Sequence, residues 1–413
     1  MTDTKKRPDG MAPQTIDVRE PAPNGVAAAF RYLTGQFRQI GLFLALIVIV
    51  AFFQITTGGI TLQPDNVSNI IIQNSYILIL AVGMVMVIIA GHIDLSVGSV
   101  VAFVGAVSGV LMTRVGLPFW LAIILCLVLG AIIGAWQGFW VAYFGIPAFI
   151  VTLAGMLIFR GAAFIALGNQ QISPFPDPFR AIGSGFLPTL GDSGYEPITV
   201  VIGLVTIVAI VLSGLRGRLT RKKYNLEDEP IWWFSLKLAF MVALVLLVTL
   251  LLASYNGTPV VLIILGVLVV VYTAVMGRTV FGRHIYAIGG NLAAATLSGV
   301  KTKRVTFLIF VNMGVLAALA GMVFTAGLNL ASPSAGNGFE LDAISAVFIG
   351  GAAVTGGIGT IPGAIIGGLI IGVLNNGMSI LGIGIEYQQL VKGLVLLAAV
   401  AFDFYNKRRG GSR

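Results

Sequence analysis

The chain has 413 residues, of which 57% are apolar, 10% are charged and 53 are glycine, with a formal net charge of +9. Roughly a quarter of the residues of an ordinary soluble domain are charged, so this composition excludes soluble enzymes, secreted domains and disordered chains. A basic surplus is typical of the cytoplasmic loops of membrane proteins, and this explanation is favoured over a nucleic-acid partner. The sequence therefore predicts an all-α polytopic membrane protein in a lipid bilayer.

The N-terminal region is polar and contains proline up to residue 24. It has no short apolar run that ends in a small-residue cleavage site, so a signal peptide is not expected. Residues 1–39 are expected to form a largely disordered cytoplasmic tail, and the transmembrane domain is expected to cover residues 40–404.

A membrane-spanning helix needs about 20 mostly apolar residues. Twelve runs approach this length, and they cover residues 40–56, 67–90, 96–113, 118–143, 148–167, 198–214, 232–253, 260–276, 305–328, 341–357, 362–381 and 386–404. An even number of spans places both termini on one side of the membrane. The run 341–357 is short and interrupted by glycine, so a re-entrant segment or a half-helix is the alternative there.

The basic residues indicate the orientation. If the N-terminus is inside, 20 of the 25 Lys and Arg residues fall in cytoplasmic segments. These segments are the N-terminal tail, the loops 215–231 and 277–304, and the C-terminal tail 405–413. The positive-inside rule therefore predicts that both termini are cytoplasmic.

The loop 168–197 is the longest on the predicted outer side and carries five prolines and three acidic residues. Two interpretations of it stay open. It is either a docking surface for an external partner or a plain connector.

The sequence offers little for catalysis or metal binding. Cys126 is the only cysteine, and His92 and His284 are the only histidines, so neither an intrachain disulfide nor a zinc cluster is expected. No Gly-Lys-Ser or Gly-Lys-Thr occurs, which excludes a phosphate-binding loop. No catalytic residues, metal site or cofactor are therefore expected in this chain.

The cytoplasmic segment 277–304 is the most specific feature. Asn291 suits a helix N-cap and Gly299 suits a C-terminal stop, which predicts a short helix between them. Small residues on such a helix favour insertion into a cleft of another protein. This segment resembles the loop that couples the permeases of ATP-binding-cassette (ABC) importers to their ATPases. The candidate coupling residues are Arg283, Gly289, Gly290, Asn291, Ala293, Ala294, Ser298 and Gly299.

The resemblance extends over roughly residues 67–404. It rests on four motifs, which are GHIDLSVGSVVAF at 91–103, GIPAFIVTLAGM at 145–156, GRHIYAIGGNLAAATLSGV at 282–300 and FELDAISAVFIGGAAVTGGIGTIPGAIIGGLIIGVLNNGM at 339–378. They resemble the inner-membrane permeases of ribose- and xylose-type sugar importers. The extra loop and span between residues 213 and 253 resemble the xylose or multiple-sugar branch more than the ribose branch.

This resemblance implies the ABC importer permease fold, with about twelve transmembrane helices, some of them broken or re-entrant. It also implies alternating-access import of a neutral monosaccharide, xylose or a related sugar, across a bacterial inner membrane. The implied partners are a second copy of the permease, a cytoplasmic ATPase that binds ATP-Mg, and a periplasmic sugar-binding protein. The chain itself is then a transport subunit and not an enzyme.

The alternative is a secondary sugar transporter driven by an ion gradient. Such a transporter needs carboxylates within the membrane for ion coupling. The candidate acids Asp94, Asp342, Glu386 and Asp403 all fall near predicted helix ends, which disfavours this alternative.

Polar residues at membrane depth are costly and are therefore candidates for function. Those in or beside the predicted spans are Gln73, Asn74, Asp94, Ser96, Asn312, Asn375 and Asn376. They belong either to the translocation path or to helix packing. For Asp94 and Ser96, capping of the following helix is favoured over sugar contact. For each of Asn312, Asn375 and Asn376, helix packing is favoured. Arg160 and Lys392 are expected to extend to water at the outer ends of their spans.

Overall fold

The computed structural model describes residues 37–189, 194–224 and 230–410, and it gives side chains for residues 41–189, 194–224 and 230–401. The predicted N-terminal tail and the acidic residues 227–229 therefore lie almost entirely outside the described residues. The chain divides into two compact units, Met1–Gly41 and Leu42–Arg413. The helical bundle described below is the second unit.

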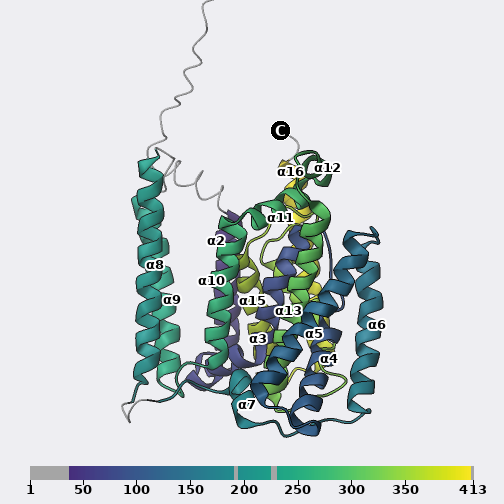
Figure 1. Ribbon diagram of the computed structural model, residues 1–413. Helices are drawn as coiled ribbons and strands as arrows, with labels where there is room; N and C mark the ends of the chain where they lie inside the picture. Colours follow the sequence, from purple (N-terminus) through teal and green to yellow (C-terminus); the bar gives the residue numbers. More distant parts are fainter. Residues whose placement is uncertain (1–36, 190–193, 225–229, 411–413) are drawn as a thin grey trace, which may run out of the picture. The chain divides into compact units, whose positions relative to one another are not determined.

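Across the described residues the chain forms fifteen α-helices and no β-strand (Figure 1). The helices are α2 (Phe37–Thr56), α3 (Pro64–Ile89), α4 (Val97–Gly109), α5 (Phe119–Ala142), α6 (Ala148–Leu167), α7 (Asp177–Ser184), α8 (Pro197–Lys223), α9 (Ile231–Ala253), α10 (Val260–Arg278), α11 (Val280–Gly290), α12 (Leu292–Leu297), α13 (Thr302–Leu328), α14 (Phe339–Ile349), α15 (Ile361–Ile380) and α16 (Ile385–Gly410). A 3-10 turn at Ile60–Leu62 precedes α3, and a π-helical turn at Val110–Arg114 continues α4.

The hydropathy pattern predicted the long helices correctly. Within the described residues, nine helices are long and apolar enough to cross a membrane, and each of them coincides with one of the twelve predicted spans. Two more predicted spans correspond to α2 and α16, which are helices of 20 and 26 residues. The chain is therefore a multi-pass membrane protein.

The prediction of a full span at 341–357 is wrong, and the half-helix alternative is confirmed. Helix α14 has only 11 residues and ends at Ile349. Ala331, before this helix, pairs with Ile172 near α7, whereas Gly357, after it, donates its N–H to the carbonyl oxygen of Ile89 near α11 at 2.8 Å. Since α7 and α11 lie at opposite ends of the bundle (Figure 1), a non-helical segment rich in turns (residues 329–338) and a short helix together cross the bundle once.

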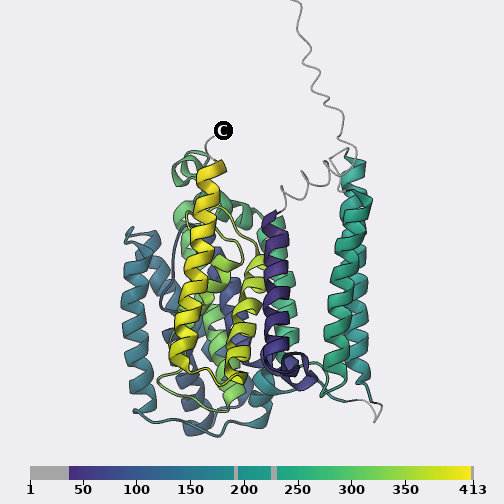
Figure 2. The same cartoon turned by 180° about the vertical axis from the view of Figure 1, so that it is seen from behind.

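Three predicted loops and tails are partly helical. Helix α8 continues to Lys223, so much of the predicted loop 215–231 extends the preceding span. The loop 168–197, predicted to be on the outer side, contains α7, which packs against α13 and α10. The predicted C-terminal tail 405–413 begins as the last part of α16. In Figure 2, the view from behind, α16 (yellow) lies in front of the rest of the bundle and the α8–α9 pair (teal) lies at its edge.

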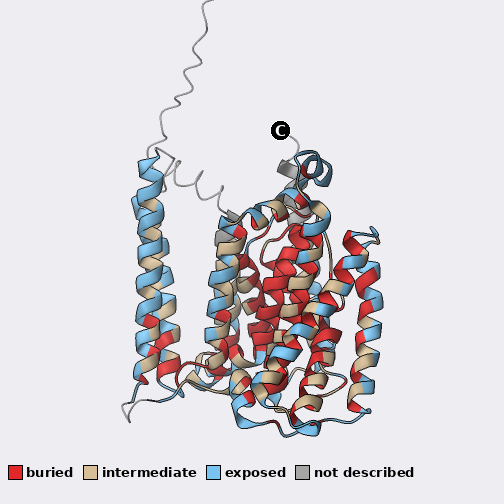
Figure 3. Ribbon diagram, in the orientation of Figure 1, coloured by how far each residue is buried: buried red, intermediate tan, exposed pale blue. Residues whose placement is uncertain are grey.

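Helix α3 forms the centre of the bundle. In its most apolar stretch 89% of the residues are buried, against 11% for α8 and 17% for α9 (Figure 3). Helix α13 lies against α3, and 61% of the residues in its most apolar stretch are buried. A helix that is apolar on all sides is stable only when other helices surround it or lipid does. Here α3 has protein around it, whereas α8 and α9 present most of their surface outward.

Glycine allows α5 and α13 to approach each other closely. A Cβ atom added to Gly134 would lie 2.2 Å from the carbonyl oxygen of Phe310, and one added to Gly314 would lie 2.2 Å from that of Gly130. Both distances are far shorter than van der Waals contact with backbone. In lipid, where apolar side chains gain little by leaving the solvent, such close backbone contact is a main source of helix association.

We predict that Gly314→Val destabilises the bundle by about 2–3 kcal/mol, because the added side chain must push α5 away from α13. Gly161→Val on α6 is the matched control, since a Cβ atom there meets nothing within 4 Å. The thermal unfolding midpoint of the detergent-purified protein measures both effects. Equal midpoints for the two variants would contradict the packing assignment.

Candidate functional site

A cavity of about 440 Å³ with both polar and apolar lining opens within the bundle. This volume is in the range of small-molecule sites, roughly 300–1,000 Å³. Five helices and one residue of the segment before α14 line it. The lining comprises Ile72, Gln73, Asn74, Ser75 and Tyr76 of α3, Val323, Phe324, Gly327 and Leu328 of α13, Asn337 two residues before α14, Phe339 and Asp342 of α14, Asn375 of α15, and Ile385, Gln388, Gln389 and Lys392 of α16. We call this cavity the chamber.

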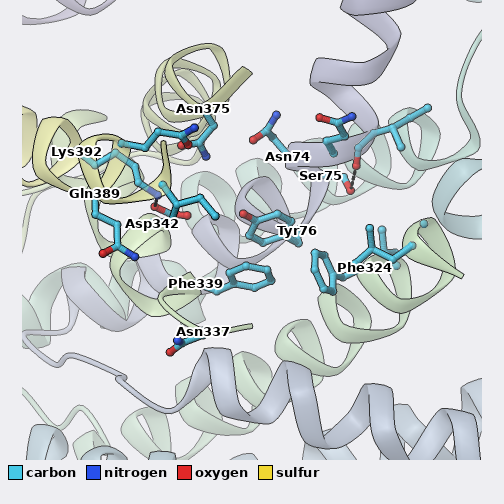
Figure 4. A pocket seen from close by; sticks show the side chains of 17 residues that line it. Asn74, Ser75, Tyr76, Phe324, Asn337, Phe339, Asp342, Asn375, Gln389 and Lys392 are labelled. Carbon is cyan, nitrogen blue, oxygen red and sulfur yellow. Dashed lines mark hydrogen bonds and ion pairs between the residues drawn. The ribbon is translucent and has the colours of Figure 1, made fainter. Parts of the chain in front are cut away.

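Three aromatic rings form one wall of the chamber (Figure 4). Tyr76 and Phe339 are stacked with ring centroids 3.7 Å apart, and Phe324 meets each of them edge-on, at 5.3 Å from Tyr76 and 4.9 Å from Phe339. Because each ring supports the other two, the wall is held in one arrangement.

An ion pair lies on the side of the chamber opposite Phe324. Lys392 Nζ donates to Asp342 Oδ1 at 2.8 Å, and the two side chains are 21% and 9% exposed. Lys392 therefore does not extend to water as expected, because a carboxylate on α14 is within reach and neutralises it. Figure 4 shows the ring of Tyr76 with its hydroxyl directed toward this pair.

Three of the seven predicted membrane-depth residues line the chamber, namely Gln73, Asn74 and Asn375. Asn74 donates through Nδ2 to the carbonyl oxygen of Ile70 at 2.9 Å. The Oδ1 atom of Asn375 is buried and accepts no hydrogen bond from any described residue. Such an atom is costly unless a ligand or water reaches it.

The other four predicted residues lie outside the chamber and pack helices together. Asn376 and Asn66 exchange two amide hydrogen bonds of 2.9 and 3.0 Å, which join α15 to α3. Asn312 accepts a short hydrogen bond from the Tyr272 hydroxyl and contacts the sulfur of Met86 at 3.6 Å. For these two amides the geometry matches the favoured packing interpretation.

Asp94 and Ser96 belong to a buried network at the start of α4. Asp94 Oδ1 accepts from the Ser96 N–H at 2.9 Å and from the Ser96 hydroxyl at 2.6 Å, and Gln137 of α5 donates to the same hydroxyl oxygen at 2.7 Å. Ser96 occupies the N-cap position, but its side chain makes no capping hydrogen bond. The carboxylate of Asp94 thus orders the chain before the helix instead of capping its first turn.

Arg160 also has partners within the protein. Its Nη1 atom donates to the carbonyl oxygens of Pro333 and Ala335 at 2.9 and 2.5 Å. The expected extension to water is therefore wrong, because the non-helical segment 329–338 supplies carbonyl groups that no helix satisfies.

The predicted short helix at the opposite end of the bundle is confirmed as α12. Asn291 caps it by accepting the Ala294 N–H at 2.9 Å, and Gly299 ends it with a positive φ of 82°. Leu292 and Leu297 are 56% and 88% exposed, and the four residues Asn291, Ala293, Ala294 and Ser298 are exposed as well. Helix α12 thus presents small and apolar groups away from the bundle.

Helix α11, which the sequence did not predict, anchors α12 to the bundle. A Cβ atom on Gly289 would lie 1.6 Å from the carbonyl oxygen of Ile89 and 2.5 Å from the nitrogen of Gly357, so this glycine packs inward. Burial raises the pKa of the Tyr286 phenol, which stays protonated and donates to the carbonyl oxygen of Gly359 at 2.8 Å. Of the predicted coupling residues, Arg283 and Gly290 are exposed on α11, whereas Gly289 serves its packing.

The family model that matches the chain is described as the permease component of the branched-chain amino acid transport system, and it covers residues 66–400. The chain belongs to this permease family. It is the membrane subunit of an ABC importer, which implies an ATPase and a binding protein as partners. This confirms the expectation drawn from the four motifs.

Curated relatives cover nearly the whole permease. The xylose transport system permease protein XylH of Haemophilus influenzae is 41% identical over 366 residues, which is 89% of this chain and 96% of the relative. XylH of Escherichia coli K12 is 42% identical over 365 residues, 88% of this chain and 91% of the relative. The ribose import permease protein RbsC of H. influenzae is 34% identical over 367 residues, 88% of this chain and 92% of the relative. No solved structure gives a significant match.

Sequence reasoning missed most of the chamber of the permease. Tyr76 was noticeable as a polar ring within an apolar span, but Phe324 and Phe339 are indistinguishable from core residues in a chain with 25 phenylalanines. Gln388 and Gln389 lie at the start of α16, where polar residues are common. Only the fold brings these side chains to one place.

We predict that Lys392→Met destabilises the permease by about 3–5 kcal/mol, because it leaves the buried carboxylate of Asp342 without its cation. The double variant Lys392→Met/Asp342→Asn is expected to recover most of this loss, since it removes both charges together. Thermal unfolding in detergent measures each variant. Additive losses in the double variant would show that the ion pair is not the relevant interaction.

Proposed function

We propose that the permease imports a neutral monosaccharide, with D-xylose as the first candidate, across a bacterial inner membrane. In this proposal two identical copies enclose the route, a periplasmic binding protein delivers the sugar, and a separate ATPase drives alternating access. Both termini lie in the cytoplasm, and the segment 277–304 receives the ATPase. The loop 168–197 with α7 lies on the periplasmic side.

The observation that carries the proposal is the exposed helix α12. It is well capped at both ends, yet its leucines contact little of the bundle, since Leu297 is 88% exposed. An ordered helix with exposed apolar tips is typical of a protein–protein contact. Beside α12, the inward packing of Gly289 onto Ile89 supports a rigid attachment through which a partner can act on the bundle.

The charge distribution supports the proposed orientation. Helix α8 ends in Arg221, Lys222 and Lys223, and α13 begins next to Lys301. Figure 1 shows the end of α8, α12 and the end of α16 at the same end of the molecule. By the positive-inside rule this end faces the cytoplasm.

The relatives support the choice of substrate. The two relatives named for xylose transport are 41% and 42% identical, whereas the relative named for ribose import is 34% identical. The chamber agrees with an uncharged substrate because its two charged lining residues, Asp342 and Lys392, already neutralise each other.

Reconstitution tests the proposal directly. The permease, its ATPase and its sugar-loaded binding protein are placed in proteoliposomes, and entry of radiolabelled D-xylose is followed with and without ATP. Uptake is expected only when all components and ATP are present. Uptake by the permease alone, driven by a proton or sodium gradient, would overturn the proposal in favour of a secondary transporter.

We predict that Ala294→Glu lowers ATP-driven uptake by about tenfold or more, because a buried unpaired charge at the ATPase contact costs about 2 kcal/mol. The variant should insert and unfold like the wild type, since Ala294 is exposed. Tyr224→Glu, which changes an exposed residue at the same end of the molecule but outside α12, is the matched control. Wild-type uptake by Ala294→Glu would contradict the coupling assignment.

A further inference from the structure

We infer that the chamber is a binding site for the transported sugar. It accepts an uncharged, polyhydroxylated ring and disfavours charged solutes. This inference rests on the proposed function and adds where the substrate binds within the permease. It also assigns a direct role in substrate recognition to Asn375, Tyr76 and the Asp342–Lys392 pair.

The position of the chamber suits delivery from outside. Its lining includes Leu328, the last residue of α13, and Ile385, the first residue of α16. Both lie at the end of the bundle opposite α12. The chamber is therefore on the side that the binding protein would approach, and it extends inward as far as Tyr76, which is in the middle of α3.

The lining combines the two kinds of group that recognise a sugar ring. Tyr76, Phe324 and Phe339 offer aromatic surface for the C–H faces of the ring. Amide side chains can both donate to and accept from hydroxyl groups. The amide side chains that line the chamber are those of Gln73, Asn74, Asn337, Asn375, Gln388 and Gln389.

Two neighbouring asparagines show which amide is reserved for a ligand. Asn376 is fully paired with Asn66, through hydrogen bonds in both directions. Asn375, one position earlier, lines the chamber with a buried Oδ1 that no described residue satisfies. A sugar hydroxyl that donates to this atom would remove the cost of leaving it unpaired, so binding energy is available there.

The charges of the chamber decide between classes of substrate. Asp342 and Lys392 are the only charged residues among those that line it, and they are joined at 2.8 Å. A neutral sugar can bind beside this pair without separating it. A zwitterionic amino acid would have to break it and replace both contacts, and a sugar acid would meet a carboxylate without a free cation. The intact pair therefore favours the neutral sugar.

The main test compares Asn375→Leu with Asn376→Leu in the reconstituted importer. Asn375→Leu is expected to keep the wild-type unfolding midpoint and to lower xylose uptake by about tenfold, as expected for the loss of one buried hydrogen bond to substrate. It should also raise the ATP consumed per sugar. Asn376→Leu is expected to lower the unfolding midpoint instead, because Asn66 then loses its partner.

The result separates this inference from the proposed function. If the wild-type complex takes up neither xylose nor any related neutral sugar, the proposed function is wrong. If the wild type transports xylose and Asn375→Leu does so with the same rate and the same ATP consumption, only the inference about the chamber is overturned.

A labelling experiment gives a second readout that does not depend on uptake. The single cysteine, Cys126, is fully buried, so a thiol introduced by Gln389→Cys is the group that a hydrophilic thiol reagent will reach. An excess of D-xylose is expected to slow labelling several-fold, whereas xylonate and leucine are expected to have no effect. Protection by leucine and not by xylose would assign the chamber to an amino acid, and equal labelling under all conditions would overturn the inference.

Discussion

The hydrocarbon core of a bilayer offers no hydrogen-bond partner to a peptide group, and the fold depends on meeting this constraint. Helices meet it internally, but the non-helical segment 329–338 needs other partners. Arg160, which reaches over from α6, satisfies the carbonyl groups of Pro333 and Ala335, and Ala331 pairs with Ile172. A broken crossing is therefore possible only because protein surrounds it, and this break is what places Asn337, Phe339 and Asp342 in the chamber.

The same constraint explains why polar groups in this bundle serve distinct purposes. Most of them join helices, as in the pair Asn66–Asn376 and in the network of Asp94, Ser96 and Gln137. Those of the chamber are gathered in one place and are only partly satisfied by the protein. A membrane protein that transports a polar solute needs both kinds of polar group. Those between helices hold the helices together, and those in a cavity replace the hydrogen bonds that the solute made to water.

Much of the architecture was predictable from the sequence, because a spanning helix is encoded locally by about 20 apolar residues and a helix cap by one or two. The long helices and the cap at Asn291 follow from such local signals. The chamber does not, because Tyr76, Asp342 and Lys392 meet only after the chain has folded. Nor does the sequence distinguish Asn375 from Asn376. Successive residues on a helix point about 100° apart, and in a helix that is apolar almost throughout no pattern tells which direction faces a cavity.

The central helix α3 has one further consequence. Its residues 72–76 line the chamber, and its last residue, Ile89, contacts Gly289 beside helix α12. Tyr76 and Ile89 are separated by roughly 20 Å along one continuous helix, and most of that helix is enclosed by its neighbours. A rod held in this way cannot bend freely, so a small tilt imposed at one end must displace the other. The proposed substrate chamber and the proposed ATPase contact are thus joined by one continuous helix.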